Sequence, residues 1–147
     1  MDVRVQEHAF DFGTEANAFA TRQTDMGAVV TFTGIVRDSA AGNMVAMEIE
    51  HYPGMTIKAL TEITETAMER FGLGDALVIH RHGRLTRDEM IMMVATAARH
   101  RADAFAAAEF LMDYLKSRAP FWKKEISSEN SEWVAARDVD EDALKRW

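Results

Sequence analysis

The stretch Asp113-Tyr-Leu-Lys-Ser-Arg-Ala-Pro-Phe-Trp-Lys-Lys-Glu125 marks the point where a predicted helix ends and extended chain begins. Upstream, apolar residues recur at three- and four-residue steps, which predicts a helix over residues 102–116. The stripe comprises Phe105, Ala108, Leu111, Met112 and Leu115. Because the residue before a proline avoids the helical conformation, the helix must stop before Pro120 and Phe121 should begin a strand.

Four cations flank this turn, namely Lys116, Arg118, Lys123 and Lys124. The first two suit the negative end of the helix dipole, which alone would account for them. The second two point to opposite faces of the predicted strand and therefore have different roles. A partly desolvated lysine close to other cations has a lowered pKa and can act as acid, base or nucleophile. We identify Lys116 as the best candidate for that role.

Length and composition fit a single domain over residues 1–147 with a sizeable core, since 48% of the 147 residues are apolar. No apolar run reaches the length of a membrane span, and the N-terminus lacks the layout of a signal peptide. We therefore expect a soluble cytoplasmic protein with no membrane partner. The absence of cysteine excludes disulfides, zinc–thiolate sites and thiol chemistry carried by this chain.

The charge is unevenly distributed along the chain. The net charge is −7, but residues 99–124 hold six Lys or Arg against three acids, so this segment is +3 and the remainder is −10. A local cationic patch on an acidic protein suits a small anionic ligand better than a nucleic acid. Solubility alone is the other explanation of the acidic surface.

The order of predicted elements indicates an α+β fold with a mainly antiparallel sheet and packed helices. Strands are predicted over residues 2–7, 27–37, 44–52, 76–85, 89–96 and 132–137, and helices over 14–22, 55–71, 102–116 and 140–147. We expect strands 27–37 and 44–52 to form a hairpin, and Gly34 indicates either a bulge or a close backbone approach by a ligand or another strand. Thr14 is expected near the cap of the first helix.

The histidines divide into two groups. His80 and His82 lie two apart on a predicted strand, as two metal ligands would, but a third ligand at a fixed spacing is missing and no metal site is predicted. His100 lies between Arg99 and Arg101 at the start of the helix over residues 102–116, where free backbone N–H groups favour an anion. A solvated cationic helix cap is the alternative there.

Several motifs resemble the large, catalytic subunit of molybdopterin synthase. The similarity spans nearly the whole chain and includes residues 27–37, 50–55, 78–81, 112–125, 133–137 and 145–147. The resemblance implies an α/β-hammerhead-like fold with a small additional β subdomain. It also implies conversion of cyclic pyranopterin monophosphate into molybdopterin by insertion of two dithiolene sulfurs, with no permanently bound cofactor.

In the family that this chain resembles, the sulfur arrives as a thiocarboxylate on the C-terminal Gly-Gly of a small ubiquitin-like subunit. Two copies of the large subunit form a central homodimer within a heterotetramer. A sulfurtransferase without cysteine must obtain its sulfur from elsewhere, which agrees with this implication.

By the same resemblance, Lys116 and Lys123 are catalytic. The implied substrate-binding residues are Ile35, Val36, Arg37, His100, Arg101, Lys116, Lys123, Lys124, Glu125 and Arg137. Ile35 stands where related sequences often have lysine, so contacts from Ile35 or Val36 are expected through the backbone.

Two other classes of function remain possible from the residues alone. A non-catalytic module could bind a ubiquitin-like tail or a phosphorylated metabolite through the same cations. A nucleic-acid binder is disfavoured by the −10 charge outside residues 99–124.

Overall fold

The computed structural model describes residues 1–135 and 137–147, which form two four-stranded sheets and four α-helices. The first sheet has the order β1 (Asp2–Gln6), β4 (Asp75–Arg81), β6 (Met90–Ala98) and β2 (Ala28–Ile35). The second has the order β5 (Gly83–Leu85), β3 (Met44–His51), β7 (Phe121–Ser127) and β8 (Ser131–Trp133). In the described chain only β1 and β4 pair in parallel. The predicted α+β class with mainly antiparallel sheets is confirmed.

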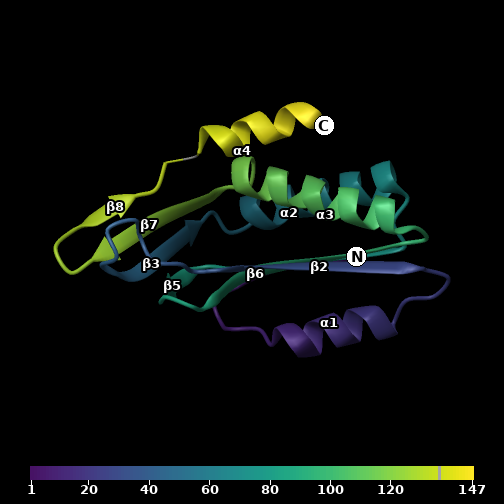
Figure 1. Cartoon of the computed structure of the whole chain (residues 1–147), viewed down its shortest axis with the longest axis horizontal. Helices are drawn as coiled ribbons and strands as arrows, with labels where there is room; N and C mark the ends of the chain where they lie inside the picture. The colour runs from purple at the N-terminus through teal and green to yellow at the C-terminus, as the bar shows by residue number, and fades with distance from the viewer. Residues whose placement is uncertain (136) are drawn as a thin grey trace.

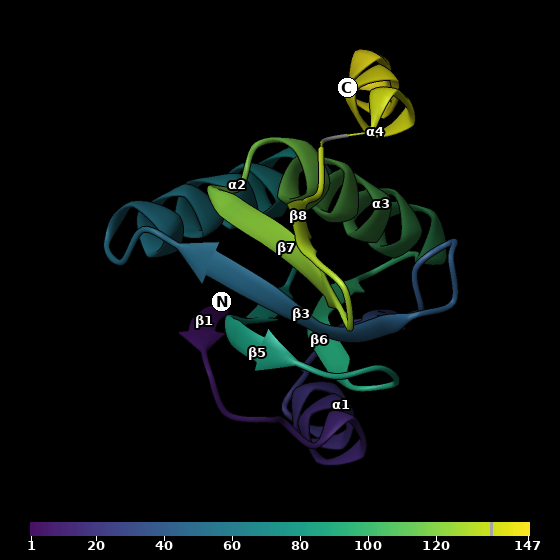
Figure 2. The same cartoon turned by 90° about the vertical axis from the view of Figure 1, so that its left-hand side faces the viewer.

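Helices cover both faces of the first sheet (Figure 1). Helix α1 (Phe12–Thr21) lies on one face, and α2 (Met55–Phe71) and α3 (Arg101–Ser117) lie on the other. The short α4 (Asp138–Ala143) and the 3-10 turn η1 (Leu144–Arg146) lie over α3. Strand β7 runs beside β3, and β8 runs beside β7 (Figure 2). Within the described residues, none of the helices has the length and apolar character needed to cross a lipid bilayer.

The two middle strands of the first sheet are buried along almost their whole length, because helices cover both faces. Side chains alternate between the faces along each strand. Leu77, Ile79 and Met93 pack with Phe19 of α1, whereas the alternate residues Ala76 and Val78 pack with the cluster that contains residues of α2 and α3. The larger cluster also contains residues of β3 and β5, so apolar packing continues between the two sheets.

The predicted hairpin between residues 27–37 and 44–52 is wrong. Strand β2 pairs with β6, and β3 pairs with β5 and β7 of the other sheet. The predicted bulge is confirmed between Gly34 and Ile35, and the loop beyond it carries the chain to the second sheet. The predicted strand 76–85 is likewise divided, because Gly83 adopts a φ of +89° and the chain changes sheets there.

Smaller differences have local causes. The N-cap of α1 is Asp11, whose carboxylate accepts a hydrogen bond of 2.8 Å from the Thr14 backbone N–H. Phe105 is 61% exposed because the buried stripe of α3 runs through Ala104, Ala108 and Leu111 instead. Strand β8 ends at Trp133, short of the predicted 137. Position 136 of that predicted strand lies outside the described residues.

Candidate functional site

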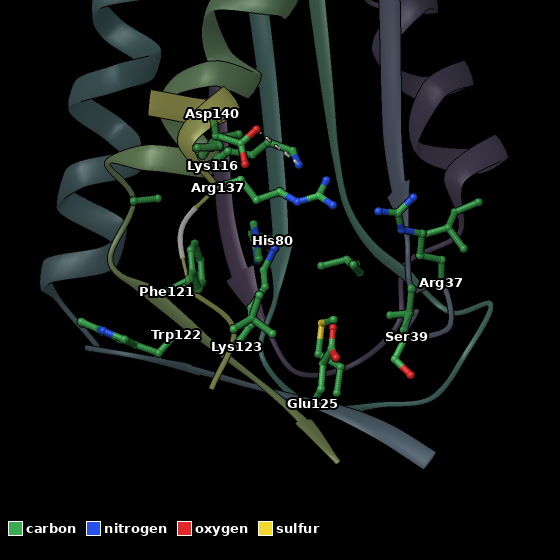
Figure 3. Close-up of a pocket in the computed structure, with 18 of the residues that line it drawn as sticks. Arg37, Ser39, His80, Lys116, Phe121, Trp122, Lys123, Glu125, Arg137 and Asp140 are labelled. Atoms are coloured by element: carbon green, nitrogen blue, oxygen red, sulfur yellow. Dashed lines mark ion pairs between the residues drawn. The ribbon is translucent and has the colours of Figure 1, made fainter. Parts of the chain in front are cut away.

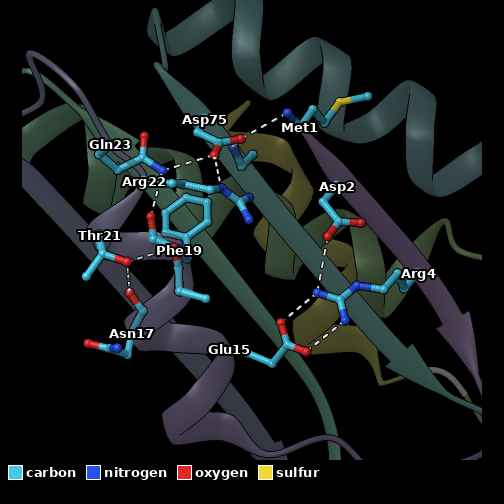
Figure 4. Close-up of polar contacts among 12 residues, drawn as sticks. Met1, Asp2, Arg4, Glu15, Asn17, Phe19, Thr21, Arg22, Gln23 and Asp75 are labelled. Atoms are coloured by element: carbon cyan, nitrogen blue, oxygen red, sulfur yellow. Dashed lines mark hydrogen bonds and ion pairs between the residues drawn. The ribbon is translucent and has the colours of Figure 1, made fainter.

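A cavity of about 850 Å³ opens where the end of α3, the strand β7 and the segment after β2 meet. Figure 3 shows its polar lining. Four cations from separate parts of the chain reach it, namely Arg37, Lys116, Lys123 and Arg137. The lining also includes Ile35, Val36, Ser39, His80, Phe121, Trp122, Glu125 and Asp140. On a protein of net charge −7, four cations gathered at one cavity favour an anionic ligand there.

Lys116 lies in the last turn of α3 and is half-exposed at the cavity. Its ammonium nitrogen is 4.0 Å from Oδ1 of Asp140, the third residue of α4. The next residue, Ser117, also contacts α4, because its hydroxyl donates a hydrogen bond of 3.0 Å to the Asp140 backbone carbonyl. Arg118, the C-cap of α3, forms bonds of 2.8 and 3.0 Å to the Glu141 carboxylate. The C-terminal helix therefore packs against the lysine end of α3.

Strand geometry divides the second pair of lysines. Every second residue along the first part of β7 lines the cavity, namely Phe121, Lys123 and Glu125. The Lys124 ammonium lies over the opposite face, 4.7 Å from the centre of the Trp133 ring. Of the four cations around the Pro turn, the cavity thus brings together Lys116 and Lys123 alone.

Lys123 is the cavity lysine with the more buried side chain. Burial lowers its pKa, repulsion from Lys116 lowers it further, and attraction to Asp140 opposes both effects. The lowered pKa makes the neutral amine more accessible near neutral pH, which suits a group that gives and takes a proton. Sequence reasoning placed this property on Lys116, because strand alternation does not reveal how deeply a side chain is buried.

The end of β2 and the residues just after it reach the cavity with different side chains. Ile35 is 52% exposed and Val36 is fully buried, although both line the cavity. The Val36 N–H donates to the Glu89 carbonyl over 2.9 Å, and its carbonyl accepts from the Asp88 N–H over 2.8 Å. Val36 therefore offers mainly its side chain to the cavity, and the charged group of this segment is Arg37.

His100 and Arg101 lie away from the cavity within one chain. His100 caps the N-terminus of α3 and Arg101 is its first residue, whereas Lys116 lies in its last turn. Lys116 lies fifteen positions after Arg101, which corresponds to about 22 Å along the axis of an α-helix. One copy of the chain therefore does not bring these predicted substrate-binding residues to the lysines.

Among the lining residues that were not identified as site residues from the sequence, Asp140 and His80 have side chains close to the two lysines. Asp140 reaches Lys116 from 24 positions downstream, and no sequence pattern connects them. His80 was considered only as a metal ligand, together with His82. The two rings have different stacking partners, because His80 stacks on Phe121 with 3.8 Å between ring centres and His82 lies against His51 at 4.2 Å.

Taken together, the fold and cavity define an α+β protein with a cation-lined cavity that contains two lysines, one of them with a lowered pKa. The family model described as MoaE protein matches residues 5–118. A molybdopterin synthase catalytic subunit from Cereibacter sphaeroides is 64% identical over 147 residues and is covered completely, as is this chain. The Escherichia coli catalytic subunit is 51% identical over 139 residues, covering 94% of this chain and 92% of that protein.

Solved structures agree with these relatives. The MoaE protein from Burkholderia ambifaria has a TM-score of 0.85 and 49% identity, with 99% of this chain and 97% of that chain covered. A Helicobacter pylori complex of subunits 1 and 2 of molybdopterin-converting factor has a TM-score of 0.78 at 18% identity, with 92% and 91% covered, and supports the fold alone. The chain belongs to the MoaE family, the catalytic subunits of molybdopterin synthase, and is an enzyme of molybdenum cofactor biosynthesis. The alternative of a non-catalytic binding module is set aside.

Proposed function

We propose that this enzyme converts cyclic pyranopterin monophosphate into molybdopterin by inserting two dithiolene sulfurs. Each sulfur would come from the C-terminal thiocarboxylate of a small ubiquitin-like subunit. The observation that carries the proposal is the convergence of Lys116, Lys123, Arg37 and Arg137 on one cavity. The reaction brings together two anions, a substrate phosphate and a thiocarboxylate, and charge-assisted hydrogen bonds from these cations can hold both.

The chemistry assigns different tasks to the two lysines. When a thiocarboxylate sulfur bonds to a side-chain carbon of the pterin, it would replace an oxygen on that carbon, which leaves as water or stays on the phosphate. The sulfur is still acylated by the partner, so water must then cleave the thioester and leave a carboxylate on the partner. Lys123, with its lowered pKa, suits the proton transfers that accompany these steps. Lys116 lies at the half-exposed side of the cavity, where the anionic tail would compete with Asp140 for its ammonium group. This reaction needs no permanently bound cofactor.

The proposed assembly contains the ubiquitin-like subunit and a second copy of this chain. The first is supported by the absence of cysteine, because a sulfurtransferase without a thiol of its own must take its sulfur from another molecule. The second is supported by the distance of His100 and Arg101 from the lysines, because a second copy can supply both to the cavity. Exposed apolar side chains on β2, including Val29 and Phe32, and Phe105 on α3 offer a surface for that copy.

The direct test supplies thiocarboxylated partner and pyranopterin monophosphate and measures the dithiolene product. We expect Lys116→Ala to abolish product, because the tail loses its nearest cation. Lys58→Ala is the matched control, since Lys58 is an exposed lysine of α2 whose nearest acid is Glu62 at 3.9 Å. Full activity in Lys116→Ala, or no product with wild type, would remove the proposal.

A second variant separates charge from proton transfer at Lys116. Lys116→Arg keeps the positive charge but does not readily release a proton, so we expect most activity to be lost. Wild-type turnover in this variant would mean that Lys116 serves only as an electrostatic anchor for the tail.

A further inference from the structure

His80 joins the two sheets at the wall of the cavity. It belongs to β4 of the first sheet, yet its ring stacks on Phe121 of β7 in the second sheet, with 3.8 Å between centres and 17° between planes. The residue is 4% exposed and still lines the cavity. A histidine held this way presents one fixed edge of its ring to the site.

Hydrogen bonding fixes which ring nitrogen carries the proton. Nδ1 lies 2.8 Å from the backbone carbonyl of Arg81, and a carbonyl oxygen only accepts, so Nδ1 is the donor. Burial lowers the pKa of His80 to about 3, and the positive charge of Lys123 acts in the same direction. The ring is therefore neutral near pH 7, and Nε2 carries a free lone pair.

Lys123 is the cavity lysine that comes from the same strand as Phe121, the stacking partner of His80. It lies two residues beyond Phe121 on the same face of β7, so the ring that stacks on Phe121 is next to its side chain. Figure 3 shows the Lys123 side chain extending along the cavity wall toward His80. Asp140, the nearby acid, forms its ion pair with Lys116.

We propose that His80 is a positioning residue for Lys123, with neutral Nε2 accepting a hydrogen bond from the Lys123 side-chain nitrogen and holding it toward the cavity. This role rests on the proposed function of Lys123 as a proton carrier. A carboxylate in the same place would stabilise the ammonium form and hold its proton. A neutral imidazole orients the nitrogen without that charge, which leaves the amine free to exchange a proton during sulfur transfer.

The first test measures the contact without any activity. Imidazole ¹⁵N resonances of His80 are recorded in wild type, in Lys123→Met and in Lys124→Met, the adjacent lysine on the opposite face of β7. We expect the Nε2 resonance to move downfield in Lys123→Met alone, toward the value of a nitrogen without a hydrogen bond. No movement in Lys123→Met, or an equal movement in Lys124→Met, would overturn the proposal.

The second test measures turnover in two variants. His80→Phe keeps the stacking partner of Phe121 and removes the acceptor, while His80→Gln restores a polar group near the Nε2 position. We expect kcat of His80→Phe to fall about 10- to 100-fold with little change in KM, and His80→Gln to recover part of it, as for other groups that orient a reacting side chain. Wild-type kcat in His80→Phe would overturn the role. If Lys123→Ala itself proves fully active, the proposed function fails separately, and the resonance test still decides the contact.

Discussion

Lys123 carries a positive charge on a largely buried side chain, which lowers the stability of the folded protein. A role in the reaction would explain why the charge is kept there. We expect Lys123→Met to raise the free energy of unfolding at pH 7 by about 1 kcal/mol while abolishing turnover, since methionine fills a similar volume without a charge. Lys124→Met is the matched control and should lose stability by about 0.5 kcal/mol with its contact to Trp133. Urea unfolding of the three proteins provides the comparison, and a destabilised Lys123→Met would contradict the burial argument.

The sign of the Lys123 effect can be checked with pH. Its folded pKa is lowered, so the unfolded chain binds more protons between the folded and unfolded values. Wild type should therefore gain stability as pH rises through that window, whereas Lys123→Met should not. The stability advantage of Lys123→Met over wild type should therefore shrink as the pH approaches the pKa of an exposed lysine.

His80 gives a pH dependence on the acid side. Its pKa falls from 6.5 to about 3 on folding, mainly through burial, so only the unfolded chain is protonated between these values. Its contribution is fully present above pH 6.5 and decreases by about 1.4 kcal/mol for each pH unit below it. We expect wild type to lose about 2 kcal/mol more than His80→Phe between pH 6.5 and 5 in urea titrations. Parallel curves for the two proteins would contradict this prediction.

At the scale of elements, local patterns located the helices and strands but not their partners. The three-to-four periodicity placed α2 correctly, and the restriction that Pro120 imposes placed the turn before β7, because both are decided by neighbouring residues. The hairpin prediction was wrong because β-branched and alternating residues predict a strand but do not indicate which strand it pairs with. Gly34 signalled the bulge, yet nothing nearby indicated that the chain then crosses to β5 and β7.

Gly83 is the backbone position that lets β4 and β5 enter different sheets. Its φ of +89° is strained for any residue with a Cβ, and an added Cβ would lie 3.1 Å from Glu7 Cγ. We expect Gly83→Ala to lower the free energy of unfolding by about 1–2 kcal/mol. Gly42→Ala is the control for φ alone, since Gly42 has a φ of +72° with open space around it, and it should cost less. Equal losses in thermal or urea unfolding would mean that the contact with Glu7 is unimportant.

At the scale of the whole molecule, the charge distribution predicted an anion site, and the structure concentrates four cations at one cavity. The sequence located Lys116 and Lys123 because they flank one turn. It did not locate Asp140 or His80 there, since these arrive through long-range packing between α4, β4 and β7. The sequence already placed His100 and Arg101 at the start of this helix and Lys116 at its end, whereas the resemblance assigned all three to one pocket.

That separation leads to a complementation experiment. If one copy supplies Lys116 and Lys123 while another supplies His100 and Arg101, Lys123→Ala and Arg101→Ala damage each site from different chains. Random exchange of two inactive homodimers makes half of the dimers mixed, and each mixed dimer regains one intact site of two. We therefore expect about one quarter of wild-type turnover after the variants are unfolded together and refolded, and none when they are assayed unmixed. Zero activity after exchange, with mixed dimers demonstrated by mass spectrometry of differently labelled chains, would mean that each site is built from one chain. The distant end of α3 would then serve a different purpose.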